Sequence, residues 1–98
     1  MSQQDARYVA GIGAANVDVH GRSRSPIVMR DSNPGFLGTS AGGVTRNILE
    51  NLARQGVRTA LLAAVGNDVY GEKILRDSAA AGVDVSHVLV RDGASSSC

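Results

Sequence analysis

The chain has 98 residues, of which 43% are hydrophobic and 19% charged, and its formal net charge is +1. This composition excludes a disordered charged tail and an integral membrane protein, and the length indicates one domain. The near-neutral charge gives no electrostatic reason to expect nucleic acid or anionic lipid as a partner. Twelve glycines beside two Tyr, one Phe and no Trp predict tight turns and a core that large aromatic anchors do not dominate.

The cysteine content and the start of the chain indicate a cytoplasmic protein. The single cysteine, Cys98, cannot form an internal disulfide, which fits a reducing compartment. Residues 1–7 are polar and lack the apolar stretch of a secretory signal. The longest apolar run, residues 60–65, is far too short to span a bilayer, so no membrane partner is expected.

The first part of the chain consists of an apolar stretch and a polar excursion. Residues 8–13 predict a short buried strand, and the extended pattern continues to Val19. Residues 21–38 are polar and contain Pro26 and Pro34, so they predict a loop or a small hairpin that leaves the core. Within this excursion only residues 26–29 have strand character.

The segment after Gly42 and Gly43 predicts an amphipathic helix that ends before Gly56. A turn of about 100° per residue gathers its apolar side chains on one arc, which we expect to be buried. These apolar residues are Val44, Ile48, Leu49, Leu52 and Ala53. The opposite arc is polar and carries the charged pairs Arg46–Glu50 and Glu50–Arg54.

The second half of the chain repeats this order. Residues 59–65 form an apolar run of strand length, residues 70–81 predict a helix ended by Gly82, and residues 85–90 predict a third strand. Two successive strand–helix–strand units predict an α/β fold, a parallel sheet with flanking helices. Two helices leave at least one face or edge of such a sheet without cover.

The motif Gly11-x-Gly13-x-x-Asn16 is similar to a dinucleotide-binding fingerprint, in which a third glycine stands where this chain has Asn16. That fingerprint also needs a helix to open at the loop, whereas residues 17–19 continue an extended pattern. We therefore favour glycines that let a strand pack closely against a helix over a nucleotide-binding Rossmann domain.

Polar residues at the end of the first strand form a candidate binding site. Asn16 and Asp18 are two residues apart, so extended backbone points both to the same side. Ligands bind at this end of the strands in open α/β sheets, and an amide beside a carboxylate suits two neighbouring hydroxyls. Two turn-forming residues at a strand exit fit the same spacing.

Gly42 and Gly43 open a helix whose first turn contains Asn47. Free backbone N–H groups and the positive end of the helix dipole favour ligand oxygens there. An ordinary flexible helix start is the alternative. If the helix packs beside the first strand, these residues converge with Asn16 and Asp18.

Two further groups of residues carry no predicted chemistry. Asn67-Asp68-x-Tyr70-Gly71 follows an apolar strand, and we interpret it as a turn with a helix cap rather than a catalytic loop. Neither His20 nor His87 has a Cys or His partner at metal-ligand spacing, so no metal site is predicted.

Taken in order, the motifs resemble the N-terminal part of the ribokinase/PfkB family of carbohydrate kinases. They are Ala15-Asn16-Val17-Asp18, Gly42-Gly43-Val44-Thr45-Arg46-Asn47, Val65-Gly66-Asn67-Asp68-x-Tyr70-Gly71 and Ala81-Gly82-Val83. Residues 30–35, followed by Gly-Gly-x-x-Arg-Asn, are similar to the pseudouridine kinase branch of the family. The family usually has a small residue at the position of Thr45, so we expect Thr45 either to narrow the sugar pocket or to cap the helix.

The resemblance implies that residues 1–98 are the N-terminal portion of a ribokinase-like fold, with residues 20–40 in a small β-lid over the substrate. It implies ATP- and Mg²⁺-dependent phosphorylation of a hydroxyl on a sugar or a nucleoside such as pseudouridine, and a homodimer formed through the lid. It assigns substrate binding to Asn16, Asp18, Gly42, Gly43 and Asn47.

The family's catalytic base and anion hole belong to a Gly-Ala-Gly-Asp motif that has no match in this sequence. Its ATP site has no counterpart either. We therefore expect no catalytic residue in the chain, no cofactor bound by it alone and no phosphoryl transfer by it alone. The alternative is a non-catalytic binding or dimerisation module derived from such a kinase, which pairs through an exposed strand edge.

Overall fold

The computed structural model describes residues 7–98, and this part of the chain forms strands and two helices. In chain order the elements are β1 (Val9–Ile12), β2 (Asn16–Ser23), β3 (Gly35–Gly42), α1 (Val44–Arg54), β4 (Thr59–Leu62), β5 (Ala64–Gly66), α2 (Val69–Ala80), β6 (Val83–Asp84) and β7 (Leu89–Arg91).

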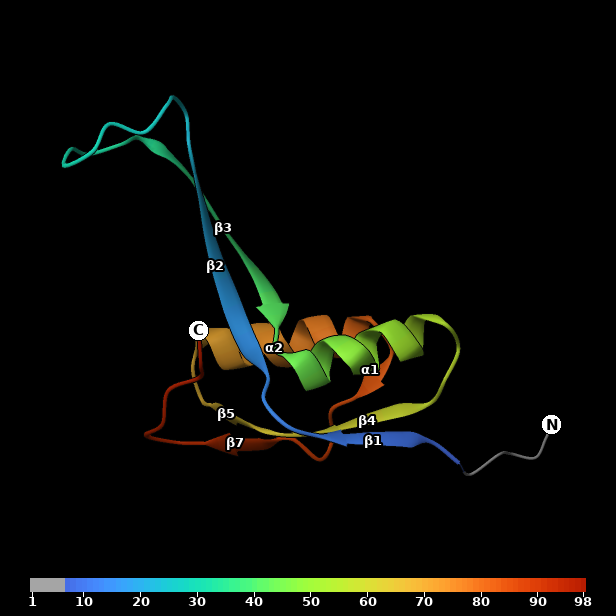
Figure 1. The fold of residues 1–98 in the computed structure, drawn as a ribbon. Helices are drawn as coiled ribbons and strands as arrows, with labels where there is room; N and C mark the ends of the chain where they lie inside the picture. The colour runs from blue at the N-terminus through green and yellow to red at the C-terminus, as the bar shows by residue number, and fades with distance from the viewer. Residues whose placement is uncertain (1–6) are drawn as a thin grey trace.

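The parallel strands form the base of the molecule. One sheet has the order β1-β4-β6, and β5 pairs with β7 in a second parallel sheet. Only Ala63 separates β4 from β5, and its carbonyl accepts a hydrogen bond of 2.9 Å from the Leu89 N–H. Both helices lie on the same face of these strands, and the β2–β3 hairpin projects away from them (Figure 1). The predicted α/β class, a parallel sheet with flanking helices and an uncovered face, is confirmed.

The polar excursion is a hairpin that starts earlier and ends later than residues 20–40. β2 and β3 pair antiparallel over eight residues each, beginning with Asn16 opposite Gly42. The prediction of strand character for residues 26–29 is wrong, because they lie in the connecting loop. The side chain of Asn33 organises this loop: its Oδ1 accepts from the Val28 N–H at 2.8 Å, and its Nδ2 donates to the Val28 carbonyl at 3.0 Å.

β1 is not the buried strand that the apolar pattern predicts. Val9 and Ile12 are exposed, and the extended run breaks at residues 13–15 before β2 begins. The reason is position: β1 is an outer strand of its sheet, and the helices cover one face only.

Gly11 and Gly13 let α1 approach β1 closely, as predicted. A Cβ added at Gly13 would lie 2.8 Å from the Thr45 Cβ, and one at Gly11 would lie 2.9 Å from the Leu49 Cδ1. Both distances are shorter than carbon atoms tolerate. Thr45 therefore fills space that the glycines leave, and no side chain caps the start of α1.

This packing rotates α1 away from the predicted orientation. Val44 and Ile48 were expected in the core, but Val44 is 77% exposed and Ile48 is exposed as well. Arg46 was expected on the solvated arc, but it is only 3% exposed, on the same face as the buried Leu49. Because Leu49 packs over Gly11, the Arg46 side chain faces α2. Its guanidinium forms a hydrogen bond with Ser78 there.

The second half of the chain follows the predicted order with shifted boundaries. α2 begins at Val69 and is capped by Asp68, and Gly82 follows it with φ +99°. The single strand predicted over residues 85–90 is wrong: β6 and β7 are separate, and a turn joins them. Aromatic residues do not dominate the core, as predicted, and Tyr70 packs against it as a partly buried residue. The buried cluster itself consists of Ala15, Val17, Leu49, Leu61, Val65, Ile74 and Val83.

Asp68 joins the start of α2 to the C-terminal segment. Its Oδ1 accepts hydrogen bonds from the Gly71 N–H (2.7 Å) and the Ser96 hydroxyl (2.8 Å), and its Oδ2 accepts one from the Ser96 N–H (2.9 Å). The Ser96 N–H, the Gly71 N–H and the Ser96 hydroxyl hold the pKa of Asp68 below its ordinary value of 3.8. The next residue, Ser97, accepts a hydrogen bond of 2.9 Å from the Val17 N–H, so this segment also supports the start of β2.

Neither α1 nor α2, the two helices among residues 7–98, is long and apolar enough to cross a membrane.

Substituting Gly13→Ala is expected to destabilise the fold by about 1–3 kcal/mol, because the added methyl group overlaps Thr45. Urea-induced unfolding measures this change. Gly38→Ala is the matched control, since the nearest atom to its added Cβ is the His20 Cδ2 at 3.8 Å. Equal stability of the two variants would contradict the close packing of α1 on β1.

Substituting Asp68→Asn is expected to destabilise the protein at neutral pH, because the amide cannot accept at both oxygen positions. The pKa of Asp68 is lower in the folded state than its ordinary value of 3.8. Its ionised form therefore stabilises the fold above about pH 3.8, and this contribution is lost as the pH falls through the folded-state pKa.

Urea unfolding at several pH values tests this, and the difference between wild type and Asp68→Asn should shrink in acid. Asp31→Asn, at the exposed hairpin loop, controls for the loss of a negative charge. A difference that stays constant with pH would refute the role of the Asp68 charge.

Candidate functional site

Polar side chains gather on one face of the hairpin near its base. Asp18 lies opposite Ser40 in the β2–β3 register, and His20 lies opposite Gly38. Side chains of directly opposed residues share a face, so this face carries Asp18, His20 and Ser40. The other face carries Val17, which is fully buried. The polar side chains of β2 and the buried Val17 therefore lie on opposite faces, as the two-residue spacing of Asn16 and Asp18 predicts.

Gly42 and Gly43 stand at the junction of the hairpin and α1. A Cβ at Gly42 would lie 2.9 Å from the Asp18 Cγ, so the Asp18 carboxylate sits directly over this glycine. Gly43 is the N-cap of α1 with φ +98°, and a Cβ there would lie 2.6 Å from the Ala14 carbonyl oxygen. Glycine alone adopts this conformation without strain and leaves this space.

The structure therefore brings four of the five predicted binding residues together. Asn16 pairs with Gly42, Asp18 lies over Gly42, and Gly43 follows. The fifth, Asn47, is exposed in the first turn of α1, and its backbone N–H donates to the Gly43 carbonyl at 2.9 Å. Within residues 7–98, its side chain makes its hydrogen bond with Arg46 and none with Asn16 or Asp18.

Arg46 is the neighbouring residue that the sequence analysis missed. It belongs to the Gly-Gly-x-x-Arg-Asn motif but was assigned to a solvated arc. Its sequence position could have indicated burial, because Arg46 lies three residues before Leu49 and seven before Ala53, and residues at these spacings share a helix face. His20 and Ser40 were missed as well, and their side chains lie within 3.3 Å of each other.

Glu50 balances the buried charge of Arg46. It forms ion pairs with Arg46 and, at 2.8 Å, with Arg54. The hydrogen bonds from Arg54 and then Arg46 hold the pKa of Glu50 below its ordinary value of 4.5. Glu50 is therefore ionised at neutral pH and neutralises the guanidinium beside Asn47.

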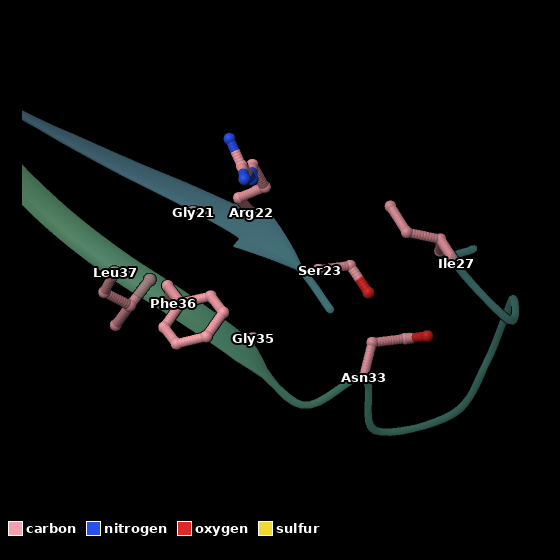
Figure 2. Close-up of a pocket in the computed structure, with 8 residues that line it drawn as sticks. All are labelled: Gly21, Arg22, Ser23, Ile27, Asn33, Gly35, Phe36 and Leu37. Atoms are coloured by element: carbon pink, nitrogen blue, oxygen red, sulfur yellow. The ribbon is translucent and has the colours of Figure 1, made fainter. Parts of the chain in front are cut away.

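A shallow hollow lies at the other end of the hairpin (Figure 2). Arg22 and Ser23 from β2, Phe36 and Leu37 from β3, and loop residues including Asn33 line it. It lies away from Asp18 and Gly42, and it includes none of the predicted binding residues.

The groups at the hairpin base can bind a ligand rich in hydroxyls. A carboxylate accepts hydrogen bonds, an amide donates and accepts, and the first N–H groups of a helix donate. Residues 7–98 bring together no cluster of three or more His, Cys, Asp or Glu side chains.

Comparison with known proteins identifies relatives of this arrangement. Residues 6–98 match the pfkB family of carbohydrate kinases. Pseudouridine kinase of Escherichia coli (strain K12) is 44% identical over 90 residues, which cover 92% of this chain and 29% of that kinase.

Solved structures agree with the sequence comparison. A carbohydrate kinase from Agrobacterium tumefaciens superposes with a TM-score of 0.85 at 28% identity, over 92% of this chain and 29% of its own. An uncharacterized sugar kinase from Pyrococcus horikoshii, solved in complex with ATP, superposes with a TM-score of 0.74 over 90% of this chain and 28% of its own. At 24% identity this second likeness concerns the fold alone.

The chain thus spans less than a third of the length of each of these relatives. The match nevertheless runs over nearly all of its own residues and includes every motif of the hairpin base. The chain belongs to the pfkB family of carbohydrate kinases.

Proposed function

We propose that this chain is the N-terminal segment of an ATP-dependent kinase that phosphorylates a hydroxyl of a sugar or nucleoside, with pseudouridine as the first substrate to test. The observation that carries the proposal is the placement of the Asp18 carboxylate over Gly42 at the start of α1. The 44% identity to a pseudouridine kinase favours this nucleoside over other sugars and nucleosides.

In this proposal the chain binds and orients the sugar. Asp18 accepts hydrogen bonds from substrate hydroxyls, Asn16 and Asn47 provide amides, Gly42 leaves room for the Asp18 carboxylate, and Gly43 allows the backbone conformation that starts α1 beside the substrate. The hairpin β2–β3, which stands out from the parallel strands, serves as part of the lid (Figure 1).

The reacting groups lie outside this chain in the same proposal. Phosphoryl transfer needs a positioned base and charge stabilisation at the transferred group. The family motif that supplies them, Gly-Ala-Gly-Asp, has no match in the 98 residues. ATP and Mg²⁺ are therefore assigned to the complete kinase, and the chain alone is expected to be inactive.

Substituting Asp18→Asn in the complete kinase is expected to raise the KM for pseudouridine by about 10- to 100-fold, because a hydrogen bond to a charged acceptor is lost. The KM for ATP should change less than about twofold, since Asp18 touches only the sugar in this proposal. Steady-state kinetics with each substrate varied in turn measures both values. An equal rise in both would count against sugar binding by Asp18.

Two glycine variants extend this test, one that should disturb Asp18 and one that serves as its matched control. Gly42→Ala places a methyl group 2.9 Å from the Asp18 Cγ and should displace the carboxylate, so it should also raise the sugar KM. Gly38→Ala changes the same strand and the same face but meets no atom closer than 3.8 Å, so its kinetics should match wild type.

The hairpin is also proposed as a homodimer contact. Its exposed apolar side chains favour this, above all Leu37 at 83% and Phe36 at 66% exposure. The alternative, a non-catalytic binding or dimerisation module, would instead pair through an exposed strand edge.

Leu37→Asp is expected to convert a dimer to a monomer, because a charge is costly to bury at such a contact. Sedimentation velocity measures the mass, and Asp31→Asn at the hairpin loop serves as a control. An unchanged mass for Leu37→Asp would exclude the hairpin as the contact.

A further inference from the structure

The Asn47 side chain is held in one orientation by Arg46. The Arg46 Nη1 donates to the Asn47 Oδ1 at 2.8 Å. A guanidinium has only donors, so the Asn47 atom that faces it is the carbonyl oxygen. The Oδ1 and Nδ2 atoms of the amide point in different directions. The Nδ2 group of Asn47 is therefore directed away from Arg46, and Asn47 is exposed on α1.

Arg46 itself has little freedom to move. Its Nε donates to the Ser78 hydroxyl of α2 at 2.9 Å, its Nη1 also donates to the Ala41 carbonyl of β3 at 3.4 Å, and its Nη2 pairs with Glu50. Arg46 is 3% exposed, and Ser78 is fully buried. Rotating the guanidinium would break several of these bonds at once and leave buried polar groups without partners.

We propose that Arg46 is a positioning residue for substrate binding, which locks Asn47 so that it presents a hydrogen-bond donor to the substrate. This inference rests on the proposed function, in which Asn47 binds a hydroxyl. Asp18 presents only acceptors, so α1 supplies a donor and β2 an acceptor. A ligand that satisfies both must use one hydroxyl as acceptor and another as donor, which neighbouring hydroxyls of a sugar can do.

Asn47→Asp gives the sharpest test, because it keeps the size of the side chain and replaces the outward hydrogen-bond donor with an acceptor. Its carboxylate would accept from Arg46 as an ion pair and present an oxygen where Asn47 presents Nδ2. In the complete kinase we expect a Tm at or above that of wild type and a KM for pseudouridine raised about tenfold or more. The KM for ATP should stay within about twofold of wild type.

Two variants of Arg46 test the positioning role directly. Arg46→Met frees the amide to turn and should raise the pseudouridine KM about 3- to 10-fold, together with a lower Tm. Arg46→Lys should raise the sugar KM less than Arg46→Met does. Its ammonium group still donates to the Asn47 oxygen but lacks the several fixed donors of the planar guanidinium. If Arg46→Met fails to fold, Arg46→Lys and Asn47→Asp carry the test.

Ser78→Ala is the matched control for a merely structural role. It removes the hydroxyl that binds Arg46 from α2 and leaves the contact with Asn47. We expect a lower Tm but a pseudouridine KM within about twofold of wild type, because the Ala41 carbonyl and Glu50 still hold the guanidinium beside Asn47.

A wild-type sugar KM in Asn47→Asp, or a loss of Tm without a change in sugar KM in the Arg46 variants, would overturn the inference. Asp18→Asn separates this failure from failure of the proposed function. A raised sugar KM in Asp18→Asn beside a wild-type KM in Asn47→Asp refutes the donor role of Asn47 and with it the positioning role of Arg46, and it leaves sugar binding by Asp18 in place. Wild-type sugar kinetics in both refutes the proposed sugar site as well.

Discussion

A buried positive charge must keep its hydrogen bonds, and this requirement fixes how the parts of this molecule meet. Arg46 is the charged residue that residues 7–98 bury, and its partners come from β3, α1 and α2. Separating any of these elements would leave an unpaired charge or hydroxyl away from water, which costs more than the bond itself contributes. The guanidinium therefore connects the base of the hairpin to both helices, and the proposed binding residues lie at this connection.

Glycines make the same junction possible by leaving space rather than by making contacts. Gly11 and Gly13 admit Thr45 and Leu49, so α1 lies close to β1 and turns Arg46 inward. Gly42 leaves room for the Asp18 carboxylate. A methyl group at these positions would meet atoms at less than 3 Å, and a well-packed interior relaxes little to accommodate it. Packing of the fold and access to the proposed site thus depend on the same small residues.

The parallel strands are packed against helices, whereas the hairpin is exposed to solvent. The two parts therefore suit different roles. The strands and helices bury an aliphatic core around Leu61 and Ile74, whereas the hairpin exposes apolar side chains such as Leu37 along its length. A two-stranded hairpin gains little stability by itself, so it depends on its base and on whatever covers it. A lid that closes over a substrate, or that pairs with a second copy, would use such a surface.

Sequence patterns alone predicted the alternation of strands and helices, the α/β class, a cap at Asn67 or Asp68 for a helix ended by Gly82, and close strand–helix packing at Gly11 and Gly13. These follow from local patterns, because periodicity, capping and glycine conformation act over a few residues. The tertiary structure alone decided that β1 lies at an edge, that the excursion forms a long hairpin, and that α1 turns Arg46 inward. Each of these depends on contacts between residues far apart in the chain, such as Arg46 with Ser78, which no local pattern encodes.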